Sequence, residues 1–237
     1  MPTEPEVLKV EVNETDSVTA LLSLAAKSAR LGLTLILGHG AGADQMSSFM
    51  RLYADGLARR GFDVMTFNFV YKERRRGAPD QKAKLEACYH AAIQAARAHR
   101  KLKGNRLLIG GKSMGGRIAS QVAAAGAGDL AGLVFLGYPL HPPGKPEQLR
   151  SAHLKEIQAP LLFVQGSRDA FGTAEELRSV IKENSLRATL YLIDGGDHSF
   201  KVPRKSGLSQ AEVYEATMDE IARWASTQSF GVILAPS

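Results

Sequence analysis

The strongest constraint on the fold of this chain is a repeated alternation between two hydrophobic periods. Six short runs rich in Val, Ile, Leu and Phe are apolar on both faces, as buried parallel strands are. They are LTLILG (33–38), FDVMTFNFV (62–70), RLLIGG (106–111), LAGLVFLGY (130–138), PLLFVQG (160–166) and ATLYLID (188–194). Stretches with helical spacing separate and follow them, at 47–61, 85–101, 114–127, 173–184 and 209–226. The alternation predicts an α/β fold: a doubly wound, mostly parallel sheet with helices on both faces.

The two ends of the chain follow a different pattern. EVLKVEV (6–12) and VTALLSLA (18–25) are strand-like runs within residues 1–30, so we expect an antiparallel hairpin at an edge of the sheet. The last residues, SFGVILAPS (229–237), are apolar and are predicted to pack on the domain or on a partner subunit. Because no linker, repeat or second core is visible, we expect residues 1–237 to form a single domain. The sequence leaves a monomer and a homodimer equally open.

Composition excludes several classes of protein. Hydrophobic residues make up 44% and charged residues 23%, with a net charge of +6, which is ordinary for a soluble globular protein. The basic run KERRR (72–76) is interpreted as a solvated loop, and no nucleic-acid-binding motif accompanies it. The single cysteine, Cys88, excludes an intrachain disulfide and a cysteine-based metal cluster. Neither a signal peptide nor a membrane span is visible, so we expect a cytoplasmic location.

The segment GGKSMGG (110–116) matches parts of two motifs. A phosphate-binding loop ending in G-K-S needs a glycine where this chain has Arg106, and the residues that follow belong to the predicted strand. The nucleotide-binding interpretation is therefore rejected. Read as G-x-S-x-G, with Gly111, Ser113 and Gly115, the segment is a nucleophile elbow between a strand and a helix. The two glycines are needed because side chains at these positions would collide. Ser113 is then presented at the carboxyl end of the strand, where α/β sheets bind ligands.

A serine hydroxyl becomes a good nucleophile only when a base removes its proton. His198, in DGGDHSF, follows the last predicted strand on a glycine-rich loop and is the favoured base. Asp169, in QGSRDAFG, follows the preceding strand and is the favoured acid to orient it. Asp194 and Asp197 are rivals for the acid, but Asp197 is better explained as a residue that caps its loop. The order Ser113, acid, base is that of an α/β-hydrolase.

An oxyanion hole needs two backbone N–H groups directed at the developing negative charge. Met114, directly after the nucleophile, is expected to supply one. The second is expected from HGAGAD (39–44), which follows an early strand, with Ala41 as first choice and Gly42 next. His39 is interpreted as a residue that orders this loop.

Together, HGAGAD, GKSMGG, GSRDAFG and GGDHSF make the chain resemble the α/β-hydrolase superfamily over residues 33–224. It looks most like the small, capless branch related to dienelactone hydrolases, and within it HGAGAD with GKSMGGRIAS is similar to the testis-expressed hydrolase-like proteins. This resemblance implies a reaction class and no substrate. Dienelactone hydrolases carry a cysteine where this chain has Ser113, and many lipases carry HGGG in the oxyanion segment.

The sequence therefore predicts a serine hydrolase that cleaves a carboxylic ester, thioester or amide through an acyl-enzyme, without a metal or organic cofactor. The alternative is a catalytically inactive binding or scaffolding module on the same fold, although no triad member is missing. The segment between residues 140 and 160 has room for only one short helix, so no separate cap domain is expected. A small soluble acyl substrate, away from membranes, fits such a site. The basic loop 68–80 favours an acidic one. The candidate substrate-binding residues are Tyr71, Tyr138, Phe171 and Phe200.

Overall fold

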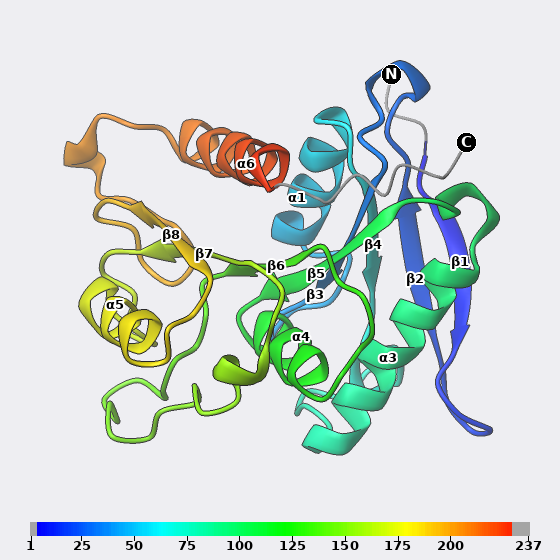
Figure 1. The fold of residues 1–237 in the computed structure, drawn as a ribbon, viewed down its shortest axis with the longest axis horizontal. Helices are drawn as coiled ribbons and strands as arrows, with labels where there is room; N and C mark the ends of the chain where they lie inside the picture. The colour runs from blue at the N-terminus through cyan, green and yellow to red at the C-terminus, as the bar shows by residue number, and fades with distance from the viewer. Residues whose placement is uncertain (1–3, 229–237) are drawn as a thin grey trace, which may run out of the picture.

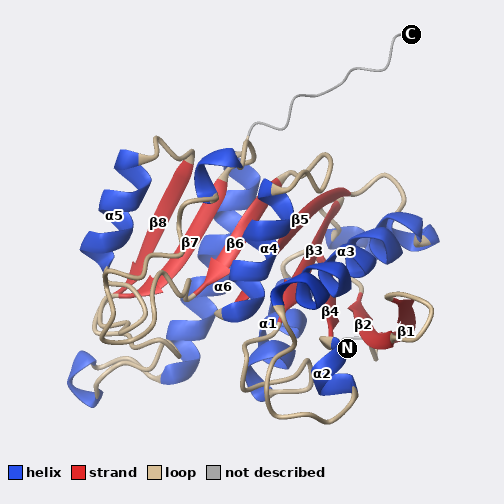
Figure 2. Ribbon diagram, turned by 90° about the horizontal axis from the view of Figure 1, so that it is seen from below, coloured by secondary structure: helices blue, strands red, loops and turns tan. Residues whose placement is uncertain are grey.

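The computed structural model describes residues 4–228, so the apolar tail at 229–237 lies outside the described residues. Within them the strands form one eight-stranded sheet in the order β1-β2-β4-β3-β5-β6-β7-β8, which can be followed across Figure 2. The strands are β1 (Glu6–Glu11), β2 (Ser17–Ser23), β3 (Leu33–Gly38), β4 (Asp63–Phe67), β5 (Arg106–Lys112), β6 (Gly132–Leu136), β7 (Leu161–Gly166) and β8 (Ala188–Ile193).

The strand directions match the sequence prediction. Strands β4, β3, β5, β6, β7 and β8 run parallel to one another. The first two strands form the predicted antiparallel hairpin at one edge, where β2 also pairs antiparallel with β4. Parallel strands place their carboxyl ends along a single edge of the sheet, so the loops that follow β3, β5, β7 and β8 lie near one another.

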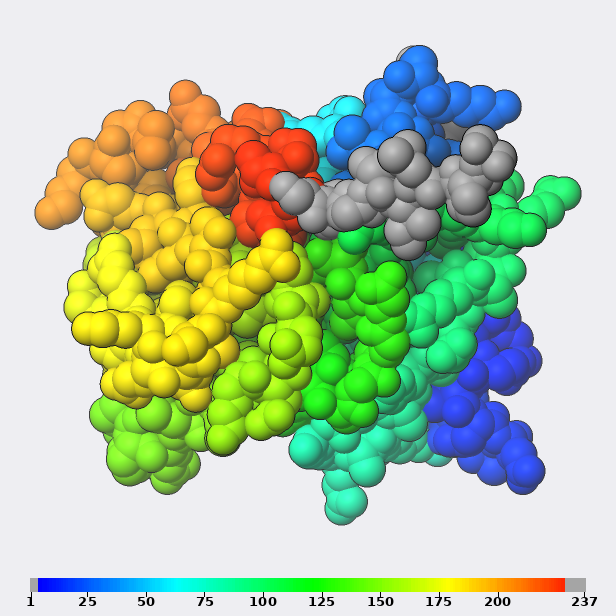
Figure 3. All heavy atoms as spheres, viewed as in Figure 1, coloured from blue at the N-terminus to red at the C-terminus, as the bar shows by residue number. Residues whose placement is uncertain are grey.

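Helices cover both faces of the sheet (Figure 1). Buried side chains of α1 (Ser48–Arg59) and α6 (Gln210–Thr227) pack on one face. Those of α3 (Lys82–Ala98), α4 (Met114–Ala124) and α5 (Ala174–Glu183) pack on the other. Helices α3 and α4 lie side by side on the surface shown in Figure 3. The doubly wound fold predicted from the hydrophobic alternation is confirmed.

At the starts of helices α5 and α6, side chains accept hydrogen bonds from backbone N–H groups that have no acceptor within the helix. The hydroxyl of Thr173 accepts a hydrogen bond from Glu176 N at 3.3 Å, and the Glu176 carboxylate accepts one from Thr173 N at 2.7 Å. Ser209 and Glu212 form the same reciprocal pair at the start of α6. Such capping boxes satisfy amide groups that have no intrahelical acceptor, so these short local sequences determine where α5 and α6 begin.

The predicted strand at 62–70 is shorter than expected. It ends at Phe67, and the chain turns into the short helix α2 (Val70–Glu73). The amide of Phe69 donates to His39 Nε2 at 3.1 Å instead of to a neighbouring strand. Because this acceptor comes from the loop after β3, the end of β4 is determined by a contact that local sequence does not contain.

The long connection between β6 and β7 contains little regular structure. Besides turns, it holds only the 3₁₀ helix η3 (Leu154–Glu156), which matches the prediction that no cap domain is inserted there. The remaining 3₁₀ helices among the described residues are η1 (Lys27–Ala29), η2 (Arg100–Leu102) and η4 (Arg204–Ser206). No helix within residues 4–228 combines the length and apolar character needed to cross a bilayer.

Candidate active site

Ser113 occupies a sharp turn between β5 and α4. Its backbone angles, φ 50° and ψ −115°, lie in a region that residues with a side chain rarely adopt. Two backbone hydrogen bonds hold the turn: Ser113 N donates to Leu136 O at 3.1 Å, and Arg117 N donates to Ser113 O at 3.1 Å. The surrounding sheet and helix therefore stabilise a strained conformation at the predicted nucleophile.

The glycines around Ser113 allow the elbow to pack against strand β3. A Cβ atom on Gly111 or Gly115 would lie 2.2 Å or 2.1 Å from the carbonyl oxygen of Gly38. A Cβ atom on Gly116 would lie 2.8 Å from Gly111 O, which is where the helix approaches its own strand. The expectation that only very small residues fit is confirmed. Its reason changes, because the closest collision is with the neighbouring strand and not between the two flanking positions.

Asp169, His198 and Ser113 form a continuous chain of hydrogen bonds. His198 Nδ1 lies 2.7 Å from Asp169 Oδ2, and His198 Nε2 lies 2.9 Å from Ser113 Oγ. Since the carboxylate can only accept, Nδ1 carries the proton and Nε2 is left to accept the serine proton. The structure thus brings together the three residues selected from the sequence.

The Asp169 side chain is buried and held by additional donors. Its Oδ1 accepts from Phe171 N at 2.8 Å, and its Oδ2 also accepts from Gln165 Nε2 at 2.9 Å. Gln165 in turn accepts from Tyr138 N at 2.8 Å. Sequence analysis missed Gln165, which lies on strand β7, four residues before Asp169. This network satisfies the buried carboxylate and fixes its direction toward His198.

The other aspartates of the histidine loop have separate positions. Asp197 Oδ1 accepts from Ser199 N at 2.7 Å and from Lys201 N at 2.9 Å. This is the loop-capping role expected from the sequence. Asp194 is exposed at the end of β8. Of Asp169, Asp194 and Asp197, it is Asp169 whose carboxylate is hydrogen-bonded to the ring of His198.

Lys112, the lysine of the G-K-S fragment, supports the histidine loop. Its Nζ donates to the backbone carbonyl of His198 and lies 5.8 Å and 5.3 Å from the ring centroids of Phe49 and Phe200. Burial lowers the pKa of Lys112 to about 8, although the nearby carboxylate of Asp169 opposes the shift. The lysine therefore connects the elbow to the base, a role unrelated to phosphate binding.

The loop after β3 is held by two side chains. His39 Nδ1 donates to Gly40 O at 2.8 Å, while its Nε2 accepts from the amide that ends β4. Burial lowers the pKa of His39 to about 4, so the ring is neutral at pH 7. Tyr71 donates its hydroxyl proton to Ala41 O at 2.7 Å. In a trans peptide the N–H points opposite to the C=O. Anchoring the carbonyls of Gly40 and Ala41 therefore fixes the N–H directions of Ala41 and Gly42.

Met114, the other expected donor, lies at the start of helix α4. It is the first residue of α4, where the backbone N–H has no acceptor within the helix and lies at the positive end of the helix dipole. Met114, Ala41 and Ser113 line the same pocket, whereas Gly42 is not part of its wall. This placement favours Ala41 over Gly42 as the partner of Met114.

A family model described as an alpha/beta hydrolase domain matches residues 32–226. The chain belongs to the α/β-hydrolase family. Solved structures share the fold at low identity. A lidless α/β serine hydrolase from Xanthomonas campestris is 19% identical, with a TM-score of 0.72 over 94% of this chain and 96% of that one. A dienelactone hydrolase from Anabaena variabilis is 17% identical, with a TM-score of 0.69 over 94% and 97%. Est1E from Butyrivibrio proteoclasticus, with ferulic acid bound, is 14% identical, with a TM-score of 0.73 over 92% and 99%.

The pocket beside Ser113 gives this α/β-hydrolase a small, open cavity of about 260 Å³. Its wall includes two arginines that sequence analysis missed, Arg117 and Arg150. Arg117 lies four residues after Ser113, so helical periodicity was a usable signal for it, whereas no sequence signal marked Arg150. The pocket is lined by Ala41, Pro79, Asp80, Lys82, Leu85, Ser113, Met114, Arg117, Pro139, Arg150 and Phe171.

Of the four residues predicted to bind substrate, Phe171 alone lines this pocket. Its ring lies 4.2 Å from the His198 ring, centroid to centroid. The prediction is wrong for Tyr138 and Phe200, whose side chains are fully buried. Tyr138 packs on Phe163 below the loop, and Phe200 lies in the core on the α1 and α6 side. Tyr71 is buried as well, and its hydroxyl group anchors the loop after β3 by donating to Ala41 O.

The basic run in the loop 68–80 also differs from expectation. Arg74 pairs with Asp16, and Arg76 pairs with Asp80. The run includes the end of helix α2 and does not line the pocket. Positive charge at the site comes instead from the two arginines and from Lys82.

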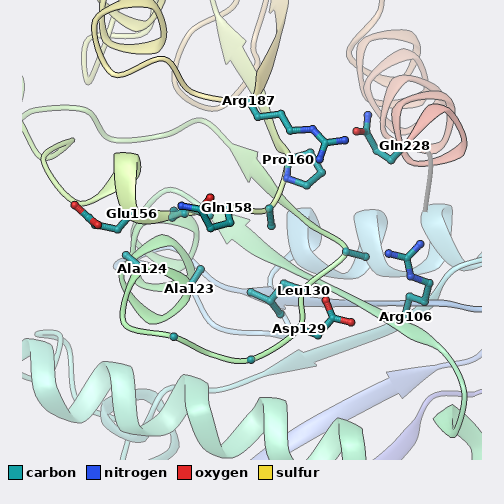
Figure 4. A pocket seen from close by; sticks show the side chains of 15 residues that line it. Arg106, Ala123, Ala124, Asp129, Leu130, Glu156, Gln158, Pro160, Arg187 and Gln228 are labelled. Atoms are coloured by element: carbon teal, nitrogen blue, oxygen red, sulfur yellow. The ribbon is translucent and has the colours of Figure 1, made fainter. Parts of the chain in front are cut away.

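A larger hollow of about 530 Å³ lies elsewhere on this α/β-hydrolase (Figure 4). Arg106, at the start of β5, borders it together with Pro160 and Arg187, which precede β7 and β8. These are the amino ends of the strands, opposite to the edge where α/β sheets bind ligands. Residues 4–228 contain no group of three or more His, Cys, Asp or Glu side chains arranged to hold a metal ion.

Proposed function

We propose that this chain is a serine hydrolase that cleaves a carboxylic ester, thioester or amide. The observation that carries the proposal is the pair of hydrogen bonds joining Asp169 to His198 and His198 to Ser113, at 2.7 Å and 2.9 Å. Nucleophile, base and orienting acid within hydrogen-bonding distance are the arrangement that activates a serine. The strained backbone at the nucleophile supports the same interpretation.

In the proposed reaction, Ser113 Oγ attacks the substrate carbonyl while His198 Nε2 accepts the hydroxyl proton. The carbonyl oxygen becomes an anion, held by the N–H groups of Met114 and Ala41. Collapse of this intermediate expels the alcohol, thiol or amine, which takes the proton from His198. Water then attacks the acyl-enzyme with the same base, releasing the acid and regenerating Ser113. Asp169 keeps the imidazole in the required tautomer throughout.

Within the superfamily we place the chain in the capless branch related to dienelactone hydrolases, nearest to the testis-expressed hydrolase-like proteins. The small open pocket supports a small soluble substrate. Est1E, a protein of similar fold, binds ferulic acid, and this small ligand is compatible with a compact acyl substrate.

Labelling with a fluorophosphonate probe tests the proposal. Wild type is expected to be labelled at Ser113, and Ser113→Ala is expected to lose labelling. Asp169→Asn and His198→Ala are expected to lower kcat on 4-nitrophenyl acetate by about 10⁴-fold, because the serine proton then has no oriented base. Ser199→Ala is the matched control, since Ser199 is exposed beside the base and outside the hydrogen-bonded chain. Correctly folded wild type that is neither labelled nor active would favour the alternative, an inactive binding module.

A further inference from the structure

Two arginines, Arg117 and Arg150, lie in the wall of the active-site pocket. Among residues 4–228, neither Arg117 nor Arg150 forms an ion pair, and Arg117 Nε is shielded from solvent without a hydrogen-bond acceptor. Several arginines elsewhere in the fold are paired, such as Arg60 with Glu215. A buried guanidinium N–H without an acceptor is unfavourable, so the protein leaves the charge of Arg117 incompletely hydrogen-bonded.

The two guanidinium groups are close enough to repel each other. Burial lowers the pKa of Arg117, and the charge of Arg150 lowers it further. A third cation, Lys82, lines the same pocket. Two of these three cations, Arg117 and Arg150, form no ion pair among the described residues, so the pocket wall carries a positive potential that attracts an anion.

The acidic groups near this pocket are already engaged. Asp80, the carboxylate in the pocket wall, pairs with Arg76. Glu86 pairs with Lys82 at 3.5 Å, and its charge opposes the lowering of the Arg117 pKa without forming an ion pair with that arginine. Neither carboxylate forms an ion pair with Arg117 or Arg150.

The backbones of both arginines are fixed relative to the nucleophile. Arg117 follows Ser113 by one turn of α4, a rise of about 6 Å. Across the pocket, the backbone of Arg150 is held by hydrogen bonds from its amide to Leu140 O at 2.7 Å and from the Tyr138 hydroxyl to its carbonyl at 3.0 Å. An anion between the two guanidinium groups therefore lies a few bonds from the carbonyl that Ser113 attacks.

We propose that the pocket selects acyl substrates that carry a carboxylate a few bonds from the scissile carbonyl, bound between Arg117 and Arg150. Planar guanidinium groups match a carboxylate with paired hydrogen bonds. The choice of substrate rests on the proposed function, whereas binding of the carboxylate requires no reaction at the serine.

The test compares charged and neutral forms of one substrate. The probes are 4-acetoxybenzoate with its methyl ester, and mono-4-nitrophenyl adipate with its methyl ester. They place the carboxylate on the leaving group and on the acyl group, respectively. Wild type is expected to favour the charged form of at least one pair by 10-fold or more in kcat/KM. Each of Arg117→Gln and Arg150→Gln is expected to lower that ratio by about 10- to 100-fold. Using a ratio cancels any general effect of the substitution on catalysis.

Arg178→Gln is the matched control, because it removes an exposed arginine from α5 with the same change in charge. It is expected to leave the ratio unchanged. Arg150→Lys, which keeps the charge but loses the planar fork, is expected to retain part of the preference. A wild-type enzyme that hydrolyses both forms equally well overturns the inference while the proposed function stands.

A binding measurement separates this inference from the proposed function. Calorimetry with Ser113→Ala measures the affinity for 4-acetoxybenzoate and for its methyl ester without turnover. Tighter binding of the charged form that is lost in Ser113→Ala combined with Arg150→Gln supports the site, even if wild type proves inactive. Equal binding of both forms by Ser113→Ala, together with no charge preference in turnover, contradicts it.

Discussion

A single hydroxyl group connects the buried part of the site to its oxyanion loop. Tyr71 was predicted from the sequence to contact substrate, but its side chain lies behind the loop and donates to Ala41 O at 2.7 Å. Burial raises the pKa of Tyr71, with the carboxylates of Asp80 and Asp44 adding to the shift, so the phenol remains a donor at neutral pH. We interpret Tyr71 as a positioning residue for the loop that carries the N–H of Ala41.

Tyr71→Phe is expected to lower kcat on 4-nitrophenyl acetate by roughly 10-fold with little change in KM. Loss of an oxyanion donor costs roughly 100- to 1,000-fold, and this substitution only loosens the loop that carries one. Steady-state kinetics measure the two constants separately. Tyr191→Phe is the control, since Tyr191 lies half-buried on β8 away from the loop. A variant with a lower free energy of unfolding and an unchanged kcat would show that the hydroxyl has only a structural role.

At the scale of secondary-structure elements, the site depends on how closely α4 approaches β3. Gly38 on β3 pairs with Gly111 on β5, and Gly115 on α4 packs against the carbonyl group of Gly38. Glycine at these positions lets helix and strand backbones come into contact. The elbow is therefore a three-element junction of β3, β5 and α4.

Gly115→Ala is expected to destabilise the fold by about 3 kcal/mol, because the added methyl group would lie 2.1 Å from Gly38 O and backbone atoms must move. Urea unfolding monitored by circular dichroism measures the change. Gly77→Ala adds the same methyl group in a loop where nothing lies within 4 Å, and it is expected to change stability by less than about 0.5 kcal/mol. Equal stability of both variants would show that the junction tolerates a methyl group.

The same elements show what the sequence could predict. Strands apolar on both faces, and the spacing of the elbow, are local patterns, so the sheet, the hairpin and the order of the site residues were predictable. The direction of a loop side chain is not local. Phe200 follows the base closely, but its backbone has φ 65° and its ring enters the core. Arg150 enters the pocket only because Leu140 and Tyr138 hold its backbone, which no local pattern encodes.

At the scale of the whole molecule, segments far apart in the chain meet at one edge of the sheet. The loops after β3, β5, β7 and β8 contribute the oxyanion donor, the nucleophile, the acid and the base of the proposed site. Two histidines, His39 and His153, hold parts of this assembly. His39 bonds the loop after β3 to Phe69 N, and His153 Nε2 lies 2.7 Å from Ser120 Oγ on α4. Stability of the fold therefore depends on keeping these rings neutral.

Two histidines are expected to make stability fall as the solution becomes acidic. Burial lowers the pKa of both His39 and His153 to about 4, and the charges of Lys82 and Arg117 add to the shift for His153. In the unfolded chain a histidine has a pKa near 6.5. Between these values the unfolded state binds protons that the folded state does not, so the free energy of unfolding decreases as pH falls from about 6.5 to 4. His141 contributes to stability with the opposite sign. Burial lowers its pKa, but hydrogen bonds with Pro142 O and Glu176 raise it by more. The free energy of unfolding that this group contributes therefore decreases as pH rises above about 6.5.

Denaturant unfolding at pH 7 and pH 5 tests this dependence. Between these two pH values, the His39 ring alone is expected to lower the free energy of unfolding by about 2 kcal/mol. The contribution of His153 is expected to be smaller, because this ring is less buried. His39→Gln is expected to lower stability at pH 7 and to flatten the dependence on pH by that amount. His90→Gln, on the half-buried side of α3, is the control and is expected to keep the wild-type slope. The measured quantity is the difference between the two pH values, so a variant that is merely less stable does not imitate the effect. A slope that is equally steep in His39→Gln would show that other groups, and not this ring, make the fold sensitive to acid.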